Sequence, residues 1–97
     1  MADELGLDVS QRVAQQEAFQ RREGEVEAVR TESAAGALGM EAYFDRVHGA
    51  NERFYDAMEA RLGTEQRVLL RRYREQSRSG VDTLRAEARK TNTRVNR

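Results

Sequence analysis

This chain of 97 residues contains no cysteine, no proline and no tryptophan. Without cysteine it can form neither a disulfide framework nor a thiolate metal site. It also has no run of eighteen apolar residues, and its N-terminus lacks the basic and apolar regions of a signal peptide. These absences predict a chain without a transmembrane segment, either cytoplasmic or secreted without a signal peptide.

Residues that favour helices dominate what is present. Ala, Glu, Gln, Arg and Leu are abundant, and β-branched residues are scattered. Hydrophobic residues make up 38% and charged residues 35%, which suits helices with much solvated surface. We therefore predict a single all-α domain, an antiparallel helical hairpin or a three-helix bundle, with helices at about 8–34, 40–62 and 65–90 and a mobile tail at 91–97.

Local signals place the ends of these helices. Asp8 with Gln11 three positions later is typical of a capping box at the start of the first helix. The small residues of 33–39 predict the first turn, because glycine can adopt a positive φ there. Gly63 followed by Thr64 predicts a second turn, with a glycine stop and a threonine N-cap.

Apolar residues follow each predicted helix at different quality. In the first helix they keep helical spacing imperfectly, at Val9, Val13, Phe19, Val26 and Val29. In the second helix they alternate in steps of four and three, which is a heptad seam with one polar member: Met40, Phe44, Val47, Asn51, Phe54 and Met58. The third helix has a weaker seam: Leu70, Tyr73, Ser77, Gly80, Leu84 and Ala88. The second seam, with Leu70 and Tyr73, is the predicted interaction surface.

Charges divide at Gly63 although the formal net charge is zero. Residues 1–66 hold fourteen acidic residues against seven arginines, and residues 67–97 hold three against ten basic ones. An acidic stripe follows the second helix at Glu41, Asp45, Glu52, Asp56 and Glu59. An arginine stripe follows the third at Arg67, Arg71, Arg74, Arg78, Arg85 and Arg89.

Each stripe lies one residue after its seam, and this spacing favours an antiparallel pairing of the two helices. A hairpin at Gly63 would place Glu59 near Arg67, Glu52 near Arg74 and Glu41 near Arg85. If one long helix instead continued through Gly63, the same pairs would form between two chains. The stripes are also compatible with solvated helix faces that form no such contact.

Chemical signatures are weak. Asp45-x-x-His48 with Glu41 and Glu52 resembles half of a metal-carboxylate site, but no second acid-x-x-His pair completes it. The sequence has no candidate nucleophile with a base and no phosphate-binding glycine loop, so we predict no enzyme activity, no metal and no cofactor. The arginine stripe could follow a nucleic-acid backbone, and binding to nucleic acid or another anionic surface is the alternative prediction.

A central Ala37-Leu38-Gly39 turn followed by Glu41-Ala42-Tyr43-Phe44 resembles the WXG superfamily, small helical hairpins exported by type VII secretion in actinobacteria and their relatives. Gly39 matches the family's glycine, whereas Ala37 occupies the position of its tryptophan. The family's tyrosine-to-acid export spacing occurs here only from Tyr55 to Glu59. The resemblance implies a dimeric secreted substrate or partner made of antiparallel hairpins. From residues and resemblance together, we predict a non-enzymatic protein that binds itself or another helical protein.

Overall fold

The computed structural model describes residues 2–95, and side-chain surroundings for residues 4–91. Four helices occur in this range: α1 (Ala2–Leu5), α2 (Val9–Ala34), α3 (Met40–Glu59) and α4 (Thr64–Val95). No strand occurs among residues 2–95. The predicted all-α fold is therefore confirmed.

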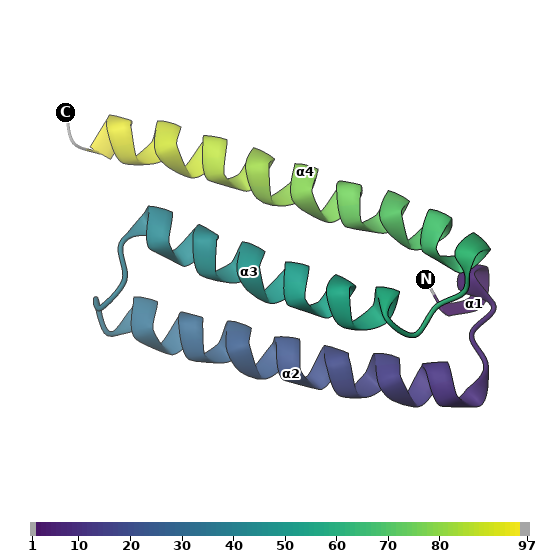
Figure 1. The fold of residues 1–97 in the computed structure, drawn as a ribbon. Helices are drawn as coiled ribbons and strands as arrows, with labels where there is room; N and C mark the ends of the chain where they lie inside the picture. The colour runs from purple at the N-terminus through teal and green to yellow at the C-terminus, as the bar shows by residue number, and fades with distance from the viewer. Residues whose placement is uncertain (1, 96–97) are drawn as a thin grey trace.

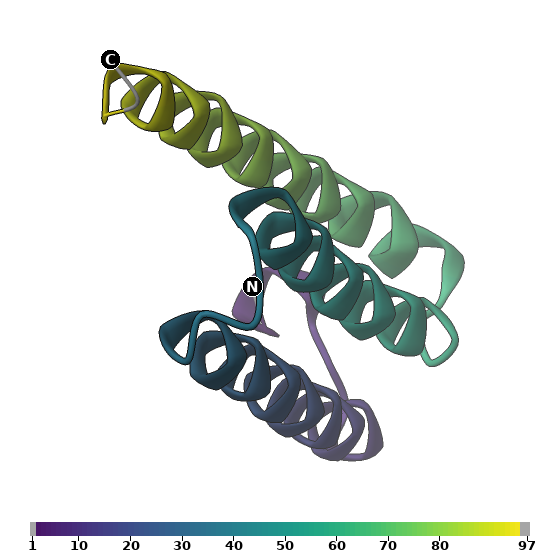
Figure 2. The same ribbon diagram turned by 90° about the vertical axis from the view of Figure 1, so that its left-hand side faces the viewer.

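The three long helices run antiparallel in chain order, and α3 packs against both α2 and α4 (Figure 1). Viewed from the end, α2 and α4 diverge from α3, and α1 lies between them at the far end (Figure 2). The molecule is elongated, with extents of 52 × 23 × 17 Å. One broad face of α3 is thus flanked by both neighbours and covered at one end by α1.

The start of α2 follows the predicted capping box. The Asp8 carboxylate accepts a hydrogen bond from the Gln11 backbone N–H at 2.8 Å, and the Gln11 side chain accepts one from the Asp8 N–H at 3.1 Å. At the other end, Gly36 has a φ of 77°, which a residue with a Cβ rarely adopts. The first turn therefore uses the glycine conformation that the sequence predicts.

Gly63 lies in a tight turn, so one continuous helix through this position is excluded. α3 ends at Glu59, three residues before the predicted end, because Leu62 turns inward and is buried. Gly63, not Thr64, takes the N-cap position: its carbonyl accepts the Arg67 N–H at 2.9 Å. The prediction of a threonine N-cap is wrong by one residue. Gly63 also turns without a positive φ, which among the described glycines occurs only at Gly6 and Gly36.

The last helix is longer than predicted. α4 continues through Ser79 and Gly80 without a break and ends at Val95. Residues 91–95, assigned to a mobile tail from the sequence, are helical. Most of them are weak helix formers, so they continue the long helix before them and do not form one by local preference. Residues 96 and 97 of that predicted tail lie outside the described part of the chain.

The main core lies at the Gly63 end. Its buried residues come from all four described helices, from the turn between α1 and α2, and from the turn at Gly63. They are Leu5, Leu7, Ala18, Phe54, Met58, Leu62 and Leu70. Of the apolar residues predicted for α2, Val26 and Val29 are buried, but Val9, Val13 and Phe19 face solvent. Val9 lies about half a helical turn from Ala18, so it points away when Ala18 meets α3.

Candidate interaction surface

The predicted seam of α3 divides into a buried half and an accessible half. Met58 and Leu70 are completely buried, and Phe54 is 8% exposed, so these three pack within the chain. Met40, Phe44, Val47 and Tyr73 are half-buried. The Tyr73 hydroxyl bonds to Glu4 of α1, so only Met40, Phe44 and Val47 of this second group are accessible to a partner while the fold stays closed.

The polar member of the seam has a partner in the same chain. Asn51 is buried, and its side-chain oxygen accepts a hydrogen bond from Arg22 Nε of α2. Buried polar groups are costly unless they are paired. Asn51 therefore fixes how α3 sits against α2.

Arg74 is the centre of the contact between the two charged stripes. Its side chain is only 12% exposed, and it reaches three carboxylates of α3. Its Nε lies 2.8 Å from Glu52, and its terminal nitrogens lie 2.8 Å from Asp56 and 3.1 Å from Glu59. The guanidinium also stands 6.0 Å from the centre of the Tyr55 ring. One arginine thus joins two turns of the acidic stripe to α4.

The ion pairs continue along the hairpin. Arg78 bonds to Glu52 through Nε at 2.7 Å, Arg85 pairs with Asp45 and lies 3.5 Å from Glu41, and Arg89 bonds to Glu41 at 2.9 Å.

Two of the three pairs expected for a hairpin occur as expected, Glu52 with Arg74 and Glu41 with Arg85. The third differs: Arg67 Nε donates to the backbone carbonyl of Glu59, because the carboxylate of Glu59 is already bound to Arg74. Arg71 forms no ion pair with the described residues and lines a shallow hollow beside Arg74 and Arg78. Since most of the arginine stripe already binds carboxylates, it presents much less positive charge to a phosphate backbone than the sequence suggests.

These contacts change the acidity of the groups involved. Hydrogen bonds from Arg78 and then Arg74 lower the pKa of Glu52 to about 2, against the opposing effect of burial. The pKa of Glu41 is lowered by its hydrogen bond to Arg89, and that of Glu25 by its bond to Arg53. All three carboxylates therefore stay charged well below neutral pH.

The accessible half of the seam forms one surface with α4, which we call the open half. Gln66 and Tyr73 lie on the side of α4 that meets α1. Helical spacing places Ser77, Leu84 and Ala88 on the same side, nearer to the C-terminus of α4. The open half consists of Met40, Phe44, Val47, Ser77, Leu84 and Ala88. Leu84 is 60% exposed, and Phe44 lies 5.9 Å from the Arg85 guanidinium at the edge of this surface.

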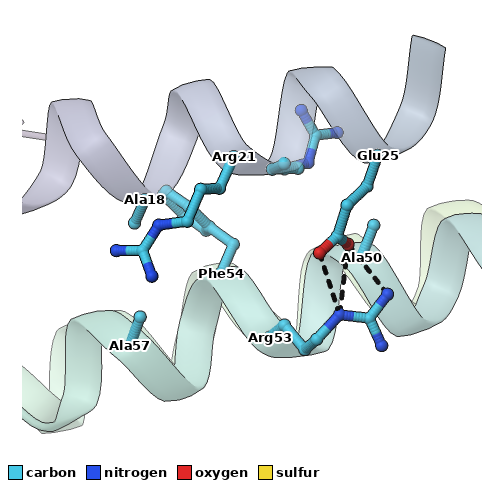
Figure 3. A pocket seen from close by; sticks show the side chains of 8 residues that line it. Ala18, Arg21, Glu25, Ala50, Arg53, Phe54 and Ala57 are labelled. Atoms are coloured by element: carbon cyan, nitrogen blue, oxygen red, sulfur yellow. Dashed lines mark hydrogen bonds and ion pairs between the residues drawn. The ribbon is translucent and has the colours of Figure 1, made fainter. Parts of the chain in front are cut away.

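A shallow pocket of about 100 Å³ lies between α2 and α3 (Figure 3). Ala18, Ala50 and Ala57 bring the two helices close, and Phe54 lies between them. The Glu25–Arg53 ion pair, at 2.8 Å, lies at one side of the pocket (Figure 3). Pockets that bind small molecules usually measure about 300 Å³ or more. We therefore regard this pocket as part of the α2–α3 contact.

The residues considered for a metal do not converge. His48 is half-buried, and its Nε2 lies 3.7 Å from Glu52, which is bound to Arg74 and Arg78. Among residues 4–91, whose side chains the structure describes, no group of three or more His, Cys, Asp or Glu side chains is placed to hold a metal ion.

A pair of glutamines joins the two turns at the Gly63 end, and the sequence reasoning missed it. Gln11 and Gln66 exchange side-chain hydrogen bonds at 2.9 and 3.1 Å. Each also accepts the N–H of its own N-cap residue, Asp8 or Gly63. The available signal is that both glutamines stand three residues after an N-cap.

Within residues 2–95, each helix is too short or too polar to cross a membrane. Comparisons with protein-family models, curated proteins and solved structures found no match to this chain.

Proposed function

We propose that this protein is a non-enzymatic helical interaction protein that uses the open half to bind a second copy of itself or another helical protein. The observation that carries the proposal is the row of apolar side chains left accessible beside Leu84. Met40, Phe44 and Val47 repeat at heptad spacing, which suits the apolar stripe of another helix.

The shape of the molecule supports this proposal. Its exposed surface is 6646 Å², whereas a folded monomer of 11.1 kDa exposes about 5,700 Å². Its radius of gyration is 15.8 Å, against about 12.5 Å for a compact chain of this length. The excess of roughly 1,000 Å² is similar to the area that one partner contributes to a standard interface, about 800 Å².

The arrangement of the ion pairs also supports an apolar contact at the open half. The ion pairs of Arg74, Arg78 and Arg85 lie along the edge between α3 and α4, so the carboxylates and arginines largely neutralise one another beside the open half. A partner helix can then approach the apolar row without leaving these charges unpaired.

The resemblance to the WXG superfamily extends this proposal to a cellular process, type VII secretion. An antiparallel helical hairpin of this length would suit a bacterial substrate or partner of type VII secretion. The Ala37-Leu38-Gly39 turn and the residues Glu41 to Phe44 that follow it support this extension.

Two exposed apolar residues of α4 give a matched test. Leu84 belongs to the open half, whereas Val68, 48% exposed, lies about half a helical turn away on the opposite side of α4. We expect Leu84→Asp to abolish self-association in analytical ultracentrifugation, or capture of the helical partner, and Val68→Asp to leave it unchanged. A strict monomer that captures no helical protein, or equal behaviour of the two variants, would contradict the proposal.

A further inference from the structure

The chain's own N-terminal segment covers the other end of the same face. Leu5 and Leu7 are each 4% exposed and belong to the core cluster with Phe54, Met58 and Leu70. Between them, Gly6 has a φ of 63°, which bends the backbone after α1. Residues 4–7, here called the strap, therefore fill an apolar site formed by the rest of the fold.

Polar groups of α4 hold the strap in place. Gln66 Nε2 donates hydrogen bonds to the carbonyls of Leu5 at 3.1 Å and Gly6 at 3.4 Å, and the Tyr73 hydroxyl donates to the Glu4 carboxylate. Backbone carbonyls are common to all peptides, but a carboxylate beside Tyr73 and two leucines specify a sequence. A segment with an acidic residue followed by Leu-x-Leu would make the same contacts.

The strap is much shorter than the helices around it. α1 has four residues, far fewer than a helix needs to be stable by itself. α2 begins with its own capping box at Asp8, so its start does not depend on the strap. Although Leu5 and Leu7 are buried, a segment of four residues outside the long helices can open locally without unfolding them.

We propose that this site binds a short segment of a partner protein with an acidic residue followed by Leu-x-Leu, and that residues 4–7 occupy the site in its absence. The strap competes at an effective concentration in the millimolar range, because it is tethered directly to α2. A partner therefore binds in proportion to how far the strap opens. This site lies outside the open half, so it stands whether or not the open half binds a helix.

The test uses the full chain with the strap weakened by Leu5→Ala and Leu7→Ala. The probe is a synthetic peptide with the sequence of residues 2–8, followed by amide chemical shifts of ¹⁵N-labelled protein. We expect shifts at Met58, Gln66 and Leu70, and an affinity at least about tenfold higher than for the unaltered chain, where the strap competes. Adding Tyr73→Phe to the weakened chain should reduce the affinity a few-fold, because the hydroxyl no longer meets the carboxylate.

A control peptide carries Asp in place of both leucines. Equal affinity of the two peptides, or no shift at the site while the weakened chain keeps its helical circular dichroism, would overturn the proposal. Loss of the helical signal in the weakened chain would overturn it as well, because the strap would then be an inseparable part of the core.

Discussion

The contact of α3 with α2 and its contact with α4 use different kinds of side chains. Toward α2, alanines at positions 18, 50 and 57 allow close approach, and the ion pairs Glu25–Arg53 and Glu32–Arg46 lie at the margin. Toward α4, the core cluster fills the Gly63 end, Val81 is buried farther along α4, and a row of ion pairs centred on Arg74 lies beside them. The contact with α4 should therefore depend more on its ion pairs than the contact with α2 does, and it should weaken more as the pH falls.

The largest expected effect comes from the apolar anchor of the α4 side. Met58→Ala removes a completely buried side chain beside Leu70, and we expect it to lower the free energy of unfolding by about 3 kcal/mol. Met40→Ala, in the same seam but half-buried, should cost roughly 1 kcal/mol. Urea unfolding followed by circular dichroism measures both. Equal losses would show that the core is not concentrated at the Gly63 end.

The next effect compares one arginine from each side of α3. Arg74→Met removes the arginine shared by Glu52, Asp56 and Glu59, of which Glu52 keeps Arg78, whereas Arg53→Met frees only Glu25 and removes a side chain that is 62% exposed. We expect losses of about 2 kcal/mol for Arg74→Met and below about 1 kcal/mol for Arg53→Met. In 1 M salt, the loss caused by Arg53→Met should shrink by the larger fraction, because salt screens the exposed Glu25–Arg53 pair more than the mostly buried pairs of Arg74. The reverse order would contradict the proposed division between the two contacts.

An effect of similar size to that of Arg74→Met appears on acidification. The folded pKa of Glu52 is about 2, below the usual value of 4.5, so its contribution is complete above pH 4.5 and disappears as the pH falls to about 2. We expect this group to contribute roughly 2 kcal/mol at neutral pH, because its side chain is mostly buried. The Glu52→Gln variant should be less stable at pH 7 and should lose less stability between pH 5 and 2. An unchanged slope in thermal or urea unfolding across this range would refute the assignment.

Much of the fold could be predicted from the sequence where periodicity and capping agreed. Asp8 with Gln11 and Met40 with Phe44 are local signals, and the helices begin where those signals occur. The antiparallel order of α3 and α4 could be inferred because charge spacing encodes it, as the pair Glu52–Arg74 shows.

The burial of the other residues could not be predicted, because it depends on contacts between distant segments. Val13 has helical spacing, but Ala18 decides which side of α2 meets α3, and spacing alone does not show which side packs. Leu5 and Leu7 are too few to form a periodic pattern, although both are buried. The division of the candidate surface into a buried and an open half could not be predicted either, because it depends on where the strap lies.

The glutamine pair has a consequence for the order of folding. The contacts between α2 and α3, and between α3 and α4, join neighbours in the sequence and need only short loops to close. Gln11 and Gln66 are 55 positions apart, so their hydrogen bonds form only after both hairpins have brought the ends together. Substitution of either glutamine should then speed unfolding while leaving the folding rate nearly unchanged, because the pair is absent from the transition state.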